Sequence, residues 1–251
     1  MALREKEVPG REERPPLRIV ISDPTGGKVQ LKVKVKGVED EAIEYKDTMK
    51  KTKEQERTEL PLAKISPAMY EKLSLSPTGV ATLSVTVEGS KTNVPLKVIQ
   101  DQAVPDGEVW VHSKLLAELT GGQEVEGVIY KAKAWQIAVP DEVAIRLAGL
   151  EIGDEFDGII IGMPGVTLKI TGGTDASGFP MHPGVPGSVR KKVLLSGPPG
   201  FHPRRRGERR KKTVRGNRIP DPRAERRKTA LAQLNVVVVY PEAKEAKAPA
   251  S

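Results

Sequence analysis

The sequence predicts a mainly β protein built around a small β-barrel, with short helices and an extended basic segment. Three observations lead to this prediction. Short apolar runs alternate with polar residues as half-buried strands do. A unit of helix, turn and strand recurs along the chain, and most of the excess positive charge is confined to one segment near the C-terminus.

The two ends of the chain have the composition of disordered tails. Residues 1–16 contain four basic and four acidic side chains together with three prolines, and residues 241–251 contain no large apolar side chain. Such segments bury too little apolar surface to offset the entropy lost on folding. We therefore expect both ends to be disordered.

Two strands are predicted at the start of the folded part. Leu17–Ile21 is apolar, and Val29–Lys36 alternates Val and Leu with Gln and Lys. The intervening SDPTGG has the residues of a tight turn, so the two strands are expected to pair as a hairpin. The lysine side of the second strand is interpreted as an ordinary solvated face.

The chain then repeats one pattern, a short amphipathic helix followed by a Gly or Pro turn and a strand. The pattern is found at residues 69–87, 114–130 and 143–161. Repeats of this kind favour a closed or nearly closed β-barrel with helices as lids. Helix, glycine and strand also follow one another by chance in many proteins, and that alternative stays open here.

The positive charge is concentrated between residues 190 and 228. This basic limb contains sixteen Lys and Arg against three acidic residues, a net charge of +13. The other 212 residues contain 25 basic and 30 acidic side chains, a net charge of −5. Such segregation favours a polyanionic partner, because neutralised phosphates release condensed counterions. A basic low-complexity tail or localisation signal is the alternative.

The residues threaded through the limb favour a structured phosphate-binding segment. Val193, Leu194 and Leu195 are expected to form a short buried strand, while Gly and Pro residues allow turns and extended stretches. Phe201 is its one aromatic residue, so phosphate contact should dominate over base stacking. In the free protein, we expect much of the limb to be mobile until it meets RNA.

Twelve Lys and Arg side chains of the limb are predicted to contact phosphate. They are Arg190, Lys191, Lys192, Arg204, Arg205, Arg206, Arg209, Arg210, Lys211, Lys212, Arg215 and Arg218.

Catalytic and metal-binding patterns are missing from the sequence. There is no cysteine, and His112, His182 and His202 lack the spacing of metal ligands. The acidic residues between 154 and 157 are typical of a solvated turn. The glycine-rich stretch 171–180 lacks the ending of a phosphate-binding loop. We therefore expect no enzyme activity, no metal, no cofactor and no small-molecule substrate.

Two local features complete this part of the prediction. In the 171–180 stretch, Asp175 and Ser177 are expected to hydrogen-bond nearby backbone and so form a structured loop. The longest apolar run, Val236–Tyr240, is far shorter than the roughly 20 residues that a membrane-spanning helix needs. No membrane association is expected.

Several of these stretches resemble a known family when they are taken in order. IGDEFDG from Ile152, then LKITGGTDASGFPM, VRKKVLLSGPPGF and GERRKKTVRGN, are similar to signature stretches of the small-subunit ribosomal protein S-six family, archaeal and eukaryotic type. LRIVISDPTGGKVQLKV resembles that family's first segment. The resemblance implies a β-barrel formed by residues 17–37 and 143–240, a cytoplasmic location in the ribosome, and neighbouring small-subunit proteins as partners. It also implies contact with small-subunit rRNA through the basic stretch.

The chain departs from that pattern between residues 38 and 142. This segment looks like an insertion, and its repeats and its own Trp110 and Trp135 predict a second β-rich domain, of the cradle-like or double-psi barrel type. At the other end, the strand expected at residues 234–240 fits the archaeal form of the family.

Two other functions remain possible on the sequence alone. A non-ribosomal RNA-binding factor in translation or RNA processing would share the basic limb. An enzyme housed in residues 38–142 would use the limb as a tether, but that segment offers no evident pairing of nucleophile and base.

Overall fold

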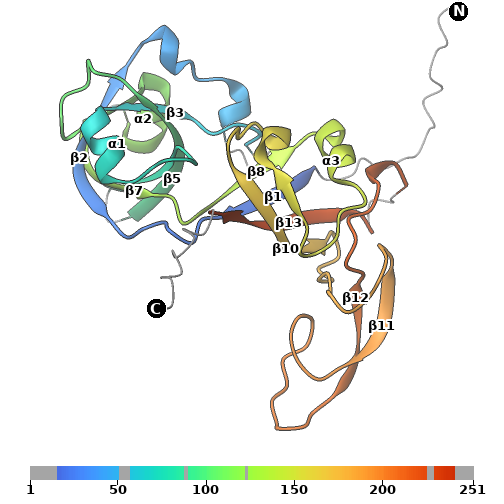
Figure 1. Cartoon of the computed structure of the whole chain (residues 1–251). Helices are drawn as coiled ribbons and strands as arrows, with labels where there is room; N and C mark the ends of the chain where they lie inside the picture. Colours follow the sequence, from blue (N-terminus) through green and yellow to red (C-terminus); the bar gives the residue numbers. More distant parts are fainter. Residues whose placement is uncertain (1–15, 51–56, 88–89, 122–123, 225–228, 241–251) are drawn as a thin grey trace, which may run out of the picture. The chain divides into compact units, whose positions relative to one another are not determined.

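The computed structural model describes residues 16–50, 57–87, 90–121, 124–224 and 229–240 (Figure 1). The predicted disordered tails at 1–16 and 241–251 therefore lie, apart from Pro16, outside the described residues. The chain divides into two compact units. The first consists of the described parts of Met1–Ile19, Ala138–Ile152 and Thr171–Asn235, and the second of those of Val20–Ile137, Gly153–Ile170 and Val236–Ser251.

A closed six-stranded barrel confirms the predicted barrel fold. Its strands are β2 (Gln30–Val38), β3 (Leu62–Ile65), β4 (Val80–Val87), β5 (Ser90–Gln100), β6 (Glu108–His112) and β7 (Val125–Lys131). They close in the order β2-β6-β3-β5-β4-β7. The β2/β6 and β3/β5 pairs are parallel, and the other four are antiparallel.

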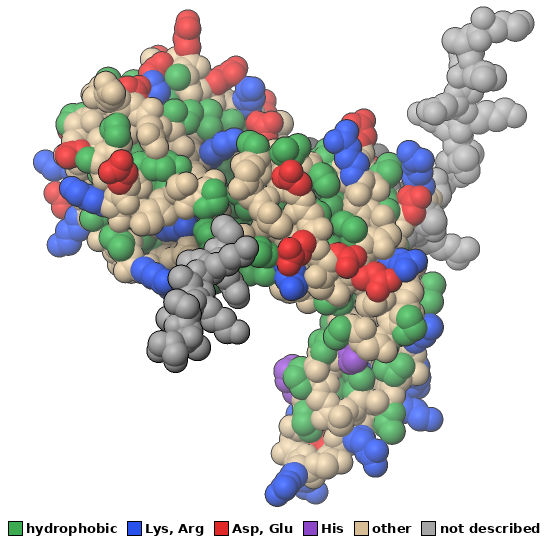
Figure 2. Space-filling model, in the orientation of Figure 1, with side chains coloured by type: hydrophobic (Ala, Val, Ile, Leu, Met, Phe, Trp, Pro, Cys, Tyr) green, Lys and Arg blue, Asp and Glu red, His purple; other side chains and the backbone are tan. Residues whose placement is uncertain are grey.

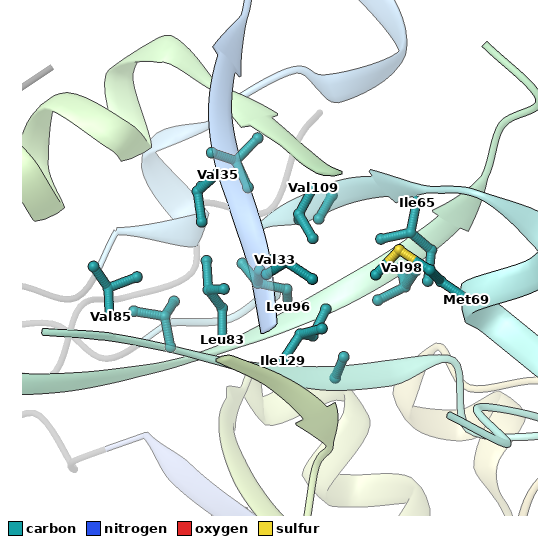
Figure 3. Packing of buried hydrophobic residues seen from close by; sticks show 14 of the residues in the cluster. Val33, Val35, Ile65, Met69, Leu83, Val85, Leu96, Val98, Val109 and Ile129 are labelled. Atoms are coloured by element: carbon teal, nitrogen blue, oxygen red, sulfur yellow. The ribbon is translucent and has the colours of Figure 1, made fainter. Parts of the chain in front are cut away.

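Alternation along the strands fills this barrel. On β2, Val33 and Val35 point inward and are buried, whereas Lys32 and Lys34 are exposed, which confirms the solvated lysine face. Branched and long aliphatic side chains from every strand meet in the interior, as Figure 3 shows. The labelled members are Val33, Val35, Ile65, Met69, Leu83, Val85, Leu96, Val98, Val109 and Ile129.

Two short helices complete the barrel core. α1 (Pro67–Lys72) begins where the Ser66 hydroxyl accepts a hydrogen bond from the Met69 amide at 3.3 Å. α2 (Ser113–Thr120) ends at Gly121, whose φ of +73° is the left-handed conformation that glycine adopts without strain. Met69 and Leu115 are buried in the core cluster, so both helices act as the predicted lids. The 3-10 helices η1 (Glu41–Ile43) and η2 (Asp47–Met49) lie in the polar stretch after β2.

Five further strands form an open sheet of order β8-β1-β13-β10-β9. It contains β1 (Leu17–Ser22), β8 (Ala134–Val139), β9 (Glu155–Asp157), β10 (Thr167–Asp175) and β13 (Leu231–Val239). α3 (Asp141–Leu147), η3 (Gly158–Ile161) and η4 (Pro222–Ala224) lie between strands. β13 confirms the strand predicted near the C-terminus and begins three residues earlier. No helix in the described ranges has the length and apolarity to cross a membrane.

The predicted hairpin of the first two strands is wrong. β1 lies between β8 and β13 in the sheet, while β2 pairs with β6 and β7 in the barrel. The chain between them packs against the segment after β7, where the Asp23 amide donates to the Lys133 carbonyl at 2.8 Å and the Gly27 amide to that of Lys131 at 2.9 Å. A Cβ on Gly26 would lie 2.4 Å from the Ala132 carbonyl oxygen, so this close approach requires glycine.

The Asp23 side chain stabilises the loop between β1 and β2 through hydrogen bonds and an ion pair. Its carboxylate accepts hydrogen bonds from the Thr25 amide at 2.8 Å and the Tyr240 hydroxyl at 2.7 Å, and lies 3.3 Å from the Lys131 ammonium. Burial alone would raise the pKa of Asp23, but these hydrogen bonds and the Lys131 charge outweigh it and hold the pKa below its ordinary value. The turn is thus fixed by tertiary partners and not by a strand pairing across it.

The closed barrel also lies elsewhere than expected. The family resemblance assigned it to residues 17–37 and 143–240, but its six strands run from Gln30 to Lys131. The first two recurring units supply α1 with β4 and α2 with β7 to the barrel, whereas the third supplies α3 and β9, and β9 belongs to the open sheet. Of the two tryptophans, Trp110 lies on barrel strand β6 and Trp135 on sheet strand β8.

Candidate nucleic-acid interface

Residues 190–215 of the basic limb are folded as a two-stranded hairpin in the first unit. β11 (Arg190–Leu195) pairs antiparallel with β12 (Arg210–Arg215), with Arg190 opposite Arg215 and Leu195 opposite Arg210. Figure 1 shows the two strands side by side, joined by a long loop at the far end. In Figure 2, Lys and Arg side chains gather along the outer surface of this part of the molecule.

One face of the hairpin is packed and the other is open. Val193, Leu195 and Val214 share a face and pack with Val185 and Phe201 in a small apolar cluster. The opposite face carries Lys192, Leu194, Lys211 and Thr213 in register. The prediction of a buried strand at 193–195 is correct for Leu195 but wrong for Leu194, which is 55% exposed, because a ribbon of two strands has only one covered face.

Phe201 belongs to the covered side. Its ring is buried in the cluster with Leu195 and Val214, so it supports the loop and presents no surface to a base. Gly200 allows this packing, because it has a φ of +95° and a Cβ there would lie 2.8 Å from Val214. Stacking on nucleobases through this aromatic is therefore excluded by its position.

The loop between the strands exposes a run of arginines. Arg204, Arg205, Arg206 and Arg209 are all exposed. Glu208 shapes the run, because its carboxylate accepts a hydrogen bond from the Arg204 amide at 2.8 Å and lies 3.1 Å from the Arg210 guanidinium. The hydrogen bond donated by the Arg204 backbone amide lowers the pKa of Glu208 more than the nearby arginine charges do.

Asp175 ties the base of the hairpin to the glycine-rich loop. One carboxylate oxygen accepts hydrogen bonds from the amides of Ser177 and Phe179, at 3.0 and 2.9 Å. This confirms that Asp175 organises the loop through backbone contacts. The other oxygen accepts a 2.6 Å bond from the Arg190 Nε, and the Arg190 guanidinium lies over the Phe179 ring, 4.8 Å from its centroid.

Arg215 lies inside the same cluster. It is 2% exposed, with its guanidinium 4.0 Å from Asp175 and bonded to the Thr229 carbonyl. Arg218 is exposed but held in place, since its guanidinium donates to Glu151 at 2.6 and 3.1 Å. Of these three arginines, Arg218 has the most exposed side chain, at 54%, against 24% for Arg190 and 2% for Arg215.

The structure therefore sorts the twelve predicted residues. Ten have exposed side chains and two, Arg190 and Arg215, are committed to Asp175. The ten are Lys191, Lys192, Arg204, Arg205, Arg206, Arg209, Arg210, Lys211, Lys212 and Arg218. Sequence reasoning missed the anchoring of the limb by Asp175, because nothing in the local pattern links residue 175 to residues 190 and 215.

The acidic residues between 154 and 157, which were weighed for catalysis, lie at strand β9. Asp154, Glu155 and Asp157 are exposed, but Glu155 and Asp157 lie on strand β9 and not in a turn. The Asp157 carboxylate accepts a hydrogen bond from the Ile159 amide at 2.9 Å, where η3 begins. Within the part of the chain that is described, no three His, Asp or Glu side chains are grouped to hold a metal ion.

The sequence is similar to known proteins over most of its length, including the hairpin. A family model described as ribosomal protein S6e matches residues 127–249, which include the hairpin. A protein of Aeropyrum pernix named small ribosomal subunit protein eS6 is 61% identical over 235 residues, 93% of this chain and 99% of that protein. The chain belongs to the ribosomal protein S6e family. The S6e proteins of Hyperthermus butylicus and Staphylothermus marinus are 47% and 45% identical over 91% and 89% of the chain.

The comparisons also bear on the 38–142 segment of this S6e chain. These relatives are matched over 99%, 99% and 98% of their own lengths. Because the Aeropyrum pernix match covers 93% of the chain, that relative has a counterpart for most of this segment. Most of the segment that forms the barrel is thus matched in the sequence of this relative.

Proposed function

We propose that this S6e chain is a structural component of the small ribosomal subunit and binds rRNA through phosphate contacts made by the β11–β12 hairpin. Membership of the family supports the first part, since its relatives are named small ribosomal subunit proteins. The exposed cations of the hairpin and its loop support the second. Neighbouring small-subunit proteins are the other expected partners, and the cytoplasmic ribosome is the expected location.

The observation that carries the RNA proposal is the distribution of charge on the hairpin. Nine of the ten exposed cations lie between Lys191 and Lys212, on two paired strands and the loop between them. Glu208 is the one acidic side chain within that range, and it is bonded to the Arg204 amide. A segment of this charge attracts phosphate, and the buried position of Phe201 leaves backbone contact as the main mode.

The ion pairs at the base of the hairpin fix the direction in which its exposed cations point. Arg190 and Arg215 bind Asp175, so the two strands leave the glycine-rich loop at fixed points. The cations beyond them are then presented along one open ribbon and not on a freely moving tail. This arrangement favours recognition of a folded RNA surface, where phosphate spacing is fixed, over attraction to any polyanion.

A pair of matched variants tests the hairpin. Replacing Lys191, Lys192, Lys211 and Lys212 with Gln removes four charges from it. Replacing Lys32, Lys34, Lys91 and Lys97 with Gln removes four equally exposed charges from the barrel. The net charge of the two variants is the same, so the control reports general attraction to polyanions.

Binding to a small-subunit rRNA fragment is measured by fluorescence anisotropy over a salt series. Each lost phosphate contact reduces the slope of log K against log salt by about 0.9, so the hairpin variant is expected to lose about 3 to 4 from that slope. The barrel variant is expected to keep most of the slope. Equal losses in both variants contradict the proposed interface.

A second experiment addresses the ribosomal role. In a native lysate washed at about 0.5 M salt, where nonspecific phosphate binding falls by orders of magnitude, the protein is expected to sediment with the small subunit. Recovery at the top of the gradient instead supports the alternative of a dissociable RNA-binding factor.

The predicted mobility of the free hairpin is part of this proposal. A two-stranded ribbon is marginally stable alone, and the covered face here buries only a small apolar cluster. Amide exchange of the isolated protein is expected to show weaker protection in β11 and β12 than in the barrel strands. Protection as strong as that of the barrel contradicts this expectation.

A further inference from the structure

A pocket in the second unit lies away from the basic hairpin in the sequence. It has a volume of about 340 Å³ and is lined by residues of β1, β5 and β8 and by the segment before β3. The lining residues are Val20, Arg57, Asn93, Pro95, Ala134, Trp135 and Gln136, all of which belong to the second unit. Its size falls in the lower range of sites that hold small molecules.

Two donors of this pocket are buried and unsatisfied. The Arg57 Nε and the Trp135 indole Nε1 are shielded from solvent, and neither has a hydrogen-bond acceptor in the described part of the chain. Trp135 is only 4% exposed. Buried donors without acceptors are rare in folded proteins and are costly, so an external acceptor is the natural complement.

The positive charge of Arg57 indicates which kind of ligand can supply the missing acceptor. Burial lowers the pKa of Arg57, and Tyr45 and Glu118 oppose this only through space. The occupant should therefore bring negative charge as well as lone pairs. Phosphate offers three terminal oxygens, and the planar fork of arginine is suited to it.

The other residues that line the pocket fit a ligand larger than a bare ion. Val20, Pro95 and Ala134 supply apolar surface, and Asn93 and Gln136 carry amides that present both donor and acceptor atoms. Apolar walls with a few polar groups are the usual composition of a small-molecule site. A sugar and base attached to the phosphate match that composition.

We propose that this pocket binds a phosphate-bearing ligand of nucleotide size, with its phosphate held by Arg57 and Trp135. The proposal does not rest on RNA binding by the hairpin, because the two sites share no residue. Both a free nucleotide and a nucleotide unit of RNA carry this chemistry.

The sequence offers a local reporter, because it contains only two tryptophans. Trp110→Phe in the full-length protein leaves Trp135 as the sole indole and removes one hydrogen bond, from Trp110 to Glu108 at 3.2 Å. Adenosine monophosphate is titrated at constant ionic strength while Trp135 emission is followed, and equilibrium dialysis measures binding independently. Saturable binding is expected by both methods.

Arg57→Gln is expected to weaken this binding at least tenfold. Arg146→Gln removes one charge from an exposed position on α3 and should bind as the parent does. Arg57→Lys keeps the charge but not the fork, and an intermediate loss is expected from it. Because this variant preserves the cation, it also separates a binding defect from a folding defect.

Competition identifies the chemistry and its source. Inorganic phosphate is expected to displace the nucleotide, whereas acetate at the same ionic strength is not. A short oligouridylate that displaces it from the four-Lys hairpin variant as well supports an RNA nucleotide, and failure to displace supports a free one. No saturable binding up to about 10 mM, equal binding by Arg57→Gln, or equal displacement by acetate overturns the proposal.

Discussion

Asp175→Ala is expected to loosen the β11–β12 hairpin while leaving the barrel intact. The Asp175 side chain is fully buried and accepts bonds from two backbone amides and from Arg190. Arg215, also buried, lies 4.0 Å away. One truncation therefore removes the acceptor of three donors and the negative charge beside a buried cation.

The size of the effect follows from these contacts. Removing one partner of a buried ion pair costs about 3–5 kcal/mol, because the other charge stays buried without compensation. The share of this cost that comes from Arg190 is expected to be small, because its side chain is 24% exposed and can turn toward water. Asp175→Asn keeps an acceptor for the Ser177 and Phe179 amides, so its cost is expected to be smaller, about 2–3 kcal/mol.

Hydrogen exchange measured by mass spectrometry separates the hairpin from the rest of the chain. Peptides covering β11 and β12 should exchange faster in Asp175→Ala than in Asp175→Asn, and faster in both than in the parent. Peptides of β4 and β7 should be unchanged, because these strands belong to the second compact unit and Asp175 to the first. A loss of hairpin stability below about 1 kcal/mol in Asp175→Ala refutes the anchoring role.

Three further predictions concern other parts of the fold. Leu83→Ala, in the barrel core with no exposed surface, is expected to cost about 2–5 kcal/mol in urea unfolding followed by circular dichroism. Gly216→Ala places a Cβ 1.9 Å from the Gly187 carbonyl oxygen, so the melting temperature should fall, and an unchanged value contradicts the crowding. Asp23 has a folded pKa below its ordinary value of 3.8, so its stabilisation is present above that pH and lost as the pH falls through the folded pKa. The stability difference between the parent and Asp23→Asn, measured by urea unfolding, should accordingly shrink in acid.

Sequence patterns predicted the elements better than their partners. The strands at 17–21 and 29–36 were found because alternation and apolar runs are local properties. Their pairing was not, because SDPTGG has the residues of a hairpin turn whether or not the strands meet. Contacts from Lys131, Lys133 and Tyr240, more than a hundred residues away, decide the path of that loop. Local turn chemistry gives no access to such partners.

The same limit applies to the candidate interface. Charge density identified the limb, because a count of Lys and Arg needs no structure. The sorting of its cations into exposed and anchoring groups depends on register, since Arg190 and Arg215 face each other at the one end of the ribbon where Asp175 is buried. Eight of the twelve predicted residues are arginines, and the chemistry that suits arginine to phosphate also suits it to a buried carboxylate. This hairpin uses two of its cations, Arg190 and Arg215, to attach its base to Asp175, and only the fold shows which two.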